Sequence, residues 1–235
     1  MFFSPCNYLP GSASSLLNYI LEENWNAVIG HVQNVPQDAR RWTNVGIDGK
    51  HQTRLLPLHK ACAYKPPVSV IDALLQAHPQ AAREKQSIFG RIPLHVACMK
   101  GSSFEVIRML IQVYPEGVQV RDSSGRLPLH YAVFRNVPIE VINALLSNYP
   151  EGAKIKDRKG WTPIKLSRAH KSTEEVLQAL LSTNCEYCKS LNQGNNDEGD
   201  KFCPQNGISA AERMGVKQLI DEIDAEFDFT NGVES

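Results

Sequence analysis

A short motif recurs along this chain at a nearly constant spacing. The copies read LPLHKAC at 56–62, IPLHVAC at 92–98 and LPLHYAV at 127–133, and a weaker copy, TPIKLSR, begins at residue 162. Their heading prolines (Pro57, Pro93, Pro128 and Pro163) are 36, 35 and 35 residues apart. A fixed period of this size indicates a stack of repeated units. Stacked repeats present extended surfaces, so we expect the protein to bind a molecule rather than to convert one.

Apolar residues follow each heading proline at the same four offsets, namely 13, 14, 17 and 18 residues. These positions are occupied by Val70, Ile71, Leu74 and Leu75, and in the later copies by Val106, Ile107, Leu110, Ile111, Val141, Ile142, Leu145, Leu146, Val176, Leu177, Leu180 and Leu181. Such spacings put the residues on one face of an amphipathic helix. Pro79, Pro115 and Pro150 then end that helix. The heading proline suits the first turn of a preceding helix, because its missing N–H needs no partner there.

The PLH motif, the Ala-Cys after it, the apolar second helix and the Asp-x-x-Gly-x-x-Pro loops together resemble the ankyrin repeat. The turns at 114–117 and 149–153 look like a 35-residue variety common in algal ankyrin proteins. The resemblance covers roughly 14–183. It implies an all-α solenoid of helix–turn–helix units with protruding hairpin loops, acting as a non-catalytic adaptor or scaffold that binds another protein. It also implies that the recurring His59, His95 and His130 are structural.

The repeat pattern divides the chain as follows: an N-terminal extension at 1–11, an N-terminal cap repeat with a long finger loop at 12–56, three central repeats at 57–162, a C-terminal cap at 163–188, and a flexible acidic tail at 189–235. The first and last units depart from the motif. Residues 14–36 carry a helix pair without PLH, and Lys165 replaces the histidine in the last copy. Atypical terminal units are what a solenoid needs to cap its stack.

The resemblance places partner binding at the hairpin tips and on the exposed flank of the first helices. The matching hairpin residues are Trp42, Phe89, Arg91, Ser123, Arg126, Lys159 and Trp161, and the matching first-helix residues are Lys60, Tyr64, Met99, Lys100, Phe134 and Arg135. Arginine together with aromatic residues is the composition enriched in binding hot spots. For Trp161 and Phe134 the alternative is that they pack between repeats.

The chain has no GxSxG, phosphate loop or HExxH motif, so we expect no enzyme and no cofactor. One alternative is a zinc-dependent tail module at Cys185, Cys188 and Cys203, although structural zinc usually takes two close pairs of ligands. Otherwise Cys185 and Cys188 are a pair of thiols at the frayed end of the last helix. The scattered cysteines fit a reducing compartment, and hence an intracellular location in the cytoplasm or nucleus. We also expect no membrane span, because no run approaches about 20 apolar residues.

The net charge of zero conceals two opposite halves. Residues 1–183 hold 21 Lys/Arg against 14 Asp/Glu, whereas residues 184–235 hold 4 against 11. A second alternative is therefore a nucleic-acid or anionic-surface binder that uses the basic body, with protein favoured as the partner. Val216, Leu219, Ile220, Ile223 and Phe227 form an apolar stripe, so 208–227 is predicted to be a short acidic amphipathic helix. That helix could dock on the body, bind a partner, or belong to a solubilising extension.

Overall fold

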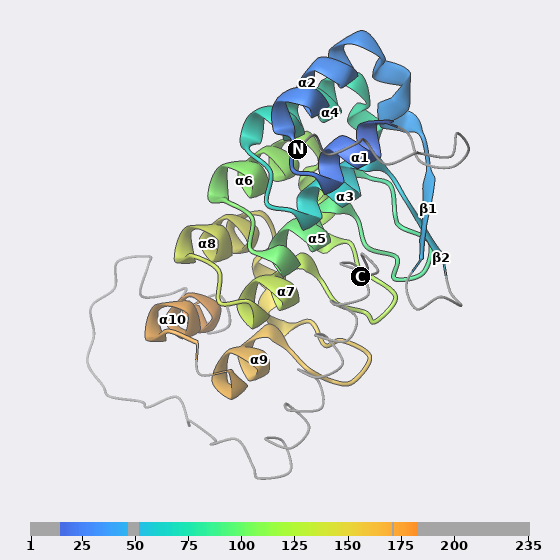
Figure 1. The fold of residues 1–235 in the computed structure, drawn as a ribbon. Coiled ribbons are helices and arrows are strands. Elements are labelled where there is room, and N and C mark those ends of the chain that lie inside the picture. Colours follow the sequence, from blue (N-terminus) through green and yellow to red (C-terminus); the bar gives the residue numbers. More distant parts are fainter. Residues whose placement is uncertain (1–14, 47–51, 171, 183–235) are drawn as a thin grey trace, which may run out of the picture.

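The computed structural model describes residues 15–46, 52–170 and 172–182. Within these ranges the helices form five successive pairs (Figure 1). The pairs are α1 (Ser15–Leu21) with α2 (Trp25–Asn34), α3 (Pro57–Ala63) with α4 (Val68–Ala77), α5 (Pro93–Lys100) with α6 (Phe104–Val113), α7 (Pro128–Phe134) with α8 (Ile139–Asn148), and α9 (Pro163–Ala169) with α10 (Glu174–Ser182). This arrangement confirms the all-α repeat solenoid.

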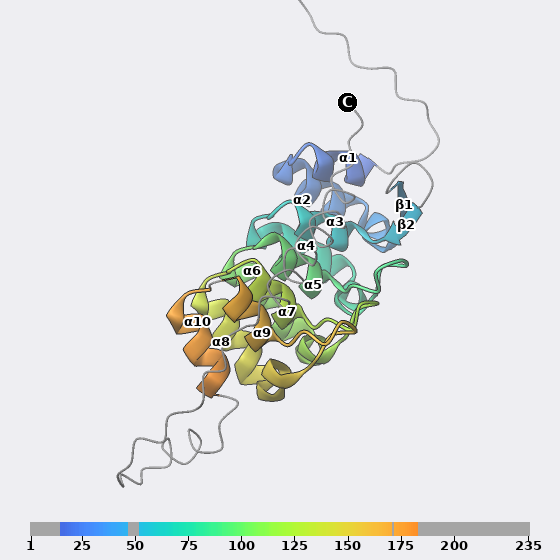
Figure 2. The same ribbon diagram turned by 90° about the horizontal axis from the view of Figure 1, so that it is seen from below.

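The first helices of the pairs form one row and the second helices form another (Figures 1 and 2). We call α1, α3, α5, α7 and α9 the inner row, and α2, α4, α6, α8 and α10 the outer row. Each helix packs on its neighbour in the same row and on its partner in the other row. The loops between units project on the side away from the outer row (Figure 2). We call them fingers 1 to 4, at residues 41–56, 83–92, 120–127 and 155–162.

The PLH motif caps the inner-row helices α3, α5 and α7, and the heading proline is their first residue, as the sequence predicts. In three repeats the backbone N–H of the preceding residue donates to histidine Nδ1, at 3.4 Å for His59, 3.3 Å for His95 and 3.0 Å for His130. The other ring nitrogen, Nε2, lies 3.1 Å from a carbonyl oxygen of the next finger in each case. Each histidine therefore joins its own helix to the following repeat.

The outer row supplies a large part of the aliphatic core. The residues at offsets 13, 14 and 17 are fully buried in α4, α6 and α8, with Leu110 at 2% exposure. Each of these helices ends just before its proline, which opens a short 3-10 helix: η2 (Pro79–Ala82), η3 (Pro115–Gln119) and η4 (Pro150–Lys154), with η1 (Pro36–Arg40) after α2. Glycine is favoured at position 117 in the YPEG turn because a Cβ there would lie 3.0 Å from the Tyr114 ring.

Finger 1 differs from the others in forming two antiparallel strands, β1 (Thr43–Gly46) and β2 (Gln52–Leu55), with Thr43 opposite Leu55. Successive fingers are joined by backbone hydrogen bonds. The amide of Ser87 donates to Arg54 O at 3.1 Å, that of Ser123 to Phe89 O at 2.8 Å, and that of Arg158 to Ser124 O at 2.9 Å. The fingers therefore form a continuous layer along the stack.

Candidate functional site

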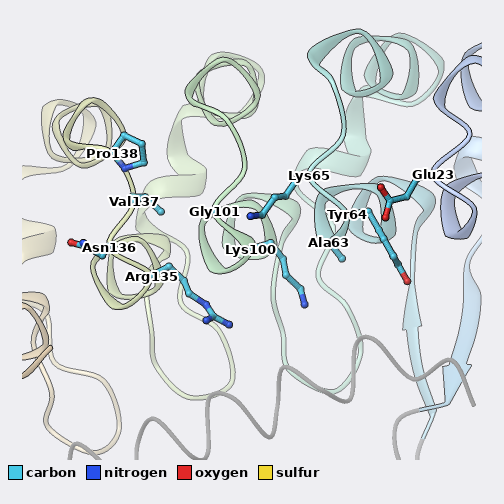
Figure 3. Close-up of a pocket in the computed structure, with 10 residues that line it drawn as sticks. All are labelled: Glu23, Ala63, Tyr64, Lys65, Lys100, Gly101, Arg135, Asn136, Val137 and Pro138. Atoms are coloured by element: carbon cyan, nitrogen blue, oxygen red, sulfur yellow. The ribbon is translucent and has the colours of Figure 1, made fainter.

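The turns that join inner-row to outer-row helices line an open groove of about 910 Å³, which we call the turn groove (Figure 3). It crosses four successive helix pairs. The lining residues with chemical character are Glu23 from the α1–α2 turn, Tyr64 and Lys65 after α3, Lys100 and Gly101 at the end of α5, and Arg135 and Asn136 after α7. An open groove that crosses several repeats suits an extended ligand better than a small molecule.

A left-handed residue in each turn builds the groove. The φ angles are 53° at Glu23, 50° at Lys65, 65° at Gly101 and 49° at Asn136. The last three lie eight residues after their heading prolines. A left-handed residue is a common way to end a helix, and it reverses the chain toward the next one. The turns therefore repeat the same backbone path in each unit.

The residue before each left-handed position projects into the groove from the inner row. These residues are Tyr64, Lys100 and Arg135, all seven residues after a heading proline. Figure 3 shows their three side chains pointing the same way, away from the outer row. The Nε of Arg135 donates to Met99 O at 2.9 Å, which fixes that side chain against the neighbouring repeat. The fold thus aligns one aromatic and two basic side chains at one repeat spacing.

Positive charge predominates along the turn groove. Lys65, Lys100 and Arg135 line it together with one carboxylate, Glu23. The Lys60 ammonium group lies 5.3 Å from the centre of the Tyr64 ring. Burial lowers the pKa of Lys60, and burial together with the negative charge of Glu23 raises the pKa of Tyr64. The groove is therefore a basic surface with an aromatic side chain at one end.

An apolar region adjoins the turn groove at Ala63, which lines both. It is a small pocket of about 20 Å³ between fingers 1 and 2 and helices α3 and α5. We call it the apolar slot, and its apolar lining includes Val45, Leu55, Phe89, Val96 and Met99. Basic and apolar surfaces thus lie side by side along the inner row, a combination suited to an amphipathic partner.

Two of the predicted binding residues are buried inside the fingers. Arg91 is 0% exposed and Arg126 is 2% exposed. Arg91 donates to the Tyr131 hydroxyl oxygen at 3.0 Å, and that hydroxyl donates to Asp122 Oδ2 at 2.6 Å. In the next repeat, Arg126 Nε donates to Asp157 Oδ2 at 3.2 Å. The expectation that these arginines lie on the surface is wrong, because each pairs with the aspartate of the following finger.

The other predicted residues differ in exposure. Ser123 and Lys159 are exposed at finger tips, whereas Trp42, Tyr64, Phe89, Arg135 and Trp161 are half-buried. Lys60 and Lys100 are buried, at 6% and 7% exposure, so the expectation that they lie on an exposed flank is wrong. Met99 and Phe134 are also buried, at 0% and 8%, so the expectation that they form an exposed flank is wrong. Phe134 instead packs edge-on against the His170 ring at 4.5 Å, between repeats.

The three motif histidines are structural. Burial lowers the pKa of His59, His95 and His130 to about 4, which keeps each ring neutral near pH 7 and leaves Nδ1 free to accept a hydrogen bond. Among the described residues there is no group of three or more His, Cys, Asp or Glu that could hold a metal ion. Cys185, Cys188, Cys203 and the predicted helix at 208–227 lie outside the described residues.

Sequence reasoning passed over Lys65, Asn136 and Glu23 because it treated the turns only as helix breaks. One signal was available. Gly101 occupies the same repeat position as Lys65 and Asn136. A glycine in one copy of a turn indicates a left-handed position in the other copies as well. The residues on either side of the left-handed position in each turn could then have been assigned to the turn groove.

The comparisons with known proteins address the central part of the chain. Residues 58–159 match the family model for ankyrin repeats, in three copies. No curated protein matches the chain. In the part of the chain that the structure describes, no helix is long and apolar enough to cross a membrane.

Proposed function

We propose that this ankyrin-repeat protein, whose repeats occupy residues 58–159, is a non-catalytic adaptor or scaffold that binds another protein on its inner side. Ankyrin repeats generally mediate protein–protein interaction and are typically non-catalytic. The binding surface we propose consists of the turn groove and the exposed finger residues Ser123 and Lys159. The buried free thiols of Cys62 and Cys98 favour a reducing compartment, so we place the protein in the cytoplasm or nucleus.

The observation that carries this proposal is the alignment of Tyr64, Lys100 and Arg135 across three repeats. The repeat determines where these side chains point, but their chemical types differ. In the outer row, the residues at offsets 13, 14, 17 and 18 are nearly the same in every repeat, because they all pack in the core. Variation at positions with a fixed direction is how repeat proteins adapt a common frame to a particular ligand.

Affinity capture by the full chain tests the proposal. We expect the groove variant Lys100→Glu/Arg135→Glu to lose its main protein partner by at least tenfold in quantitative mass spectrometry. The control variant Arg108→Glu/Lys154→Glu makes the same charge change at exposed positions away from the groove, on α6 and η4, and should retain that partner. Equal capture by both variants would contradict the proposed surface.

Salt dependence separates protein from nucleic acid in the same experiment. A nucleic-acid complex loses affinity steeply with salt, with a log–log slope of about −0.9 for each phosphate that is neutralised. We expect a shallower dependence, because the groove presents three basic side chains together with Glu23 and Tyr64. Recovery of nucleic acid, with a slope of log affinity against log salt concentration steeper than about −4, would contradict the adaptor function and support a nucleic-acid binder instead.

A further inference from the structure

The exposed side chains of fingers 2 to 4 are predominantly basic. Within residues 83–92, 120–127 and 155–162, all of which the structure describes, six basic side chains and one carboxylate, that of Glu84, are exposed. The basic residues are Arg83, Lys85, Arg121, Lys156, Arg158 and Lys159. None of these six residues lines the turn groove. The finger layer therefore presents a second basic surface, separate from the groove.

The aspartates of these fingers do not neutralise the exposed basic side chains. Asp122 and Asp157 are each 6% exposed. Asp122 Oδ2 lies 3.6 Å from Arg91 Nε, and Asp157 Oδ2 lies 3.2 Å from Arg126 Nε. Both carboxylates are therefore paired inside the finger layer with arginines that are themselves buried. The positive charge on the outside of the layer remains available to a ligand of opposite charge.

Three of the exposed basic residues form a regular row, which we call the basic ladder. Lys85, Arg121 and Lys156 each lie 28 residues after a heading proline, so they occupy the same position in successive fingers. The Nζ of Lys85 donates to Arg121 O at 3.2 Å, which places neighbouring members of the row side by side. Helices of neighbouring units pack about 8–10 Å apart, so the basic groups recur at about that interval.

The interval of the basic ladder selects the conformation of a peptide ligand. In a β-strand, side chains on one face recur every second residue, or about every 6.6–6.8 Å. In a polyproline II helix, every third side chain lies on the same side, at intervals of about 9.3 Å. Only the second interval matches the ladder. Polyproline II is also a major conformer of unfolded chains, so a flexible segment can adopt it readily.

An exposed aliphatic side chain on the same fingers favours a protein ligand over a nucleic acid. Ile88 of finger 2 is 38% exposed. It adjoins finger 3, because the Ser123 hydroxyl donates to Ile88 O at 3.0 Å. An aliphatic side chain gains from covering another apolar group, which a peptide can supply and a phosphate backbone cannot.

We propose that the basic ladder binds an acidic segment of a partner protein in the polyproline II conformation, with Asp or Glu at every third position. Each of three successive carboxylates pairs with one of Lys85, Arg121 and Lys156. Exposed charge pairs of this kind contribute to specificity and to the rate of association more than to affinity. The inference rests on the proposed function in taking a protein as the partner, but it assigns a surface separate from the turn groove.

NMR titration of the full chain with two synthetic peptides tests the spacing. The first peptide has three glutamates, one at every third position, and the second has the same composition with its glutamates adjacent. At low ionic strength, where exposed charges are screened least, we expect the first peptide to shift the amide signals of Lys85, Arg121 and Lys156. It should also bind about threefold more tightly than the second. Equal affinities, or no shift at these three amides, would overturn the proposal.

A matched pair of variants tests the residues. Arg121→Gln/Lys156→Gln should weaken binding of the spaced peptide by about fivefold, because two exposed charge pairs are lost. The control Lys65→Gln/Arg108→Gln makes the same charge change at exposed positions outside the basic ladder and should bind like the wild type. Equal losses in the two variants would show that the peptide responds only to total charge, which would contradict the assigned site.

Charge reversal keeps the test valid if these substitutions disturb the fingers. Lys85→Glu/Arg121→Glu/Lys156→Glu should lose the glutamate peptide and bind the same peptide with lysine in place of glutamate. The affinity of this reversed pair should be within about twofold of the original pair. Failure to bind, with the variant folded, would rule out the charge pairing.

Two other occupants of the basic ladder would also overturn the proposal. An oligothymidylate of the same net charge that binds more tightly than the spaced peptide would identify a nucleic-acid site. Shifts of the amide signals of 221–228 in Arg121→Gln/Lys156→Gln, without added peptide, would identify the chain's own acidic segment as the occupant.

The groove variant Lys100→Glu/Arg135→Glu separates this inference from the proposed function. It should bind the spaced peptide like the wild type, because neither substituted residue belongs to the basic ladder. Peptide binding without capture of any protein would refute only the proposed function. Capture that depends on the turn groove, without peptide binding, would refute only this inference.

Discussion

In the outer row, α6 buries Val106, Ile107 and Leu110 against equivalent aliphatic residues of the neighbouring repeats. In the inner row, α5 and α7 are just as thoroughly buried, but His95, His130 and Lys100 are among the buried residues. Both rows thus bury apolar side chains, but the inner row buries polar groups in addition. Apolar packing tolerates a change of pH, whereas buried polar groups depend on their protonation state. The two rows should therefore fail under different conditions.

Acid should expose this difference most strongly. The folded-state pKa of the three histidines is about 4 and the unperturbed value is 6.5, so between these values the unfolded chain binds more protons. The contribution of each neutral histidine to the free energy of unfolding is therefore fully present above about pH 6.5 and is lost as the pH falls toward 4. At pH 5 the loss is about 2 kcal/mol per histidine. Urea unfolding at pH 7.5 and 5.0 measures the loss. His95→Gln should remove about a third of the loss in unfolding free energy between pH 7.5 and 5.0. If the variant loses as much stability as the wild type, the acid sensitivity does not come from these histidines.

Breaking one polar link between fingers should cost nearly as much. Asp122 accepts hydrogen bonds from the amides of Ser124 and Arg126 and from the Tyr131 hydroxyl, and it pairs with Arg91. Asp122→Ala leaves a buried guanidinium without its carboxylate, so we expect a loss of about 3–5 kcal/mol in the free energy of unfolding.

The outer row supplies the control for that substitution. Asp72 is exposed on α4, and Asp72→Ala should change stability by no more than about 0.5 kcal/mol in the same denaturation assay. Comparable losses for the two aspartates would mean that the finger network contributes little.

A matched pair of leucines tests the apolar row. Leu146 of α8 and Leu181 of α10 occupy the same repeat position, but Leu146 is 4% exposed and Leu181 is only half-buried. Leu146→Ala should cost about 2–5 kcal/mol as a cavity-forming substitution, and Leu181→Ala about half as much. Chemical unfolding measures both. Equal costs would indicate that α10 is as fully covered as the central helices.

The smallest effect concerns the turns. A residue other than glycine in the left-handed region reduces the stability of the fold by roughly 1–2 kcal/mol. Glycine avoids this strain, but its greater conformational freedom in the unfolded chain cancels part of the gain. Lys65→Gly should therefore stabilise the protein by up to about 1 kcal/mol, as a rise in melting temperature. The converse substitution, Gly101→Ala, meets no atom within 4 Å and should cost about the same amount through its φ of 65° alone. A stabilising Gly101→Ala would contradict this view of the turns.

The sequence predicts the outer row well because one physical requirement, an apolar face, recurs at fixed offsets. It predicts the motif histidines for the same reason, since each performs the same two-sided bonding. The finger arginines were misplaced because charged residues in a loop are ordinarily exposed. Their burial depends on aspartates exactly one finger away, and each of the two pairs is 31 residues apart in the chain. That separation becomes informative only once the stacking of the fingers is known.

The turn groove was only partly predictable. Tyr64, Lys100 and Arg135 were singled out by their place at the ends of first helices, and the structure brings them together. Met99 and Phe134 occupy neighbouring helix positions, yet they point into the contacts between repeats. A difference of one residue on a helix rotates a side chain by about 100°, and a sequence pattern alone does not fix the orientation that closely.

The histidine contacts give the array a direction. Each of these histidines reaches forward to the finger of the next repeat, so each of these three repeats depends on its successor for one or two of the histidine contacts. Lys165 replaces the histidine in α9, and no finger after α10 lies within the described residues. A unit duplicated inside the array would find both neighbours it needs, whereas one appended after the last pair would also require a change at Lys165. Lengthening of such an array is therefore easiest from the middle.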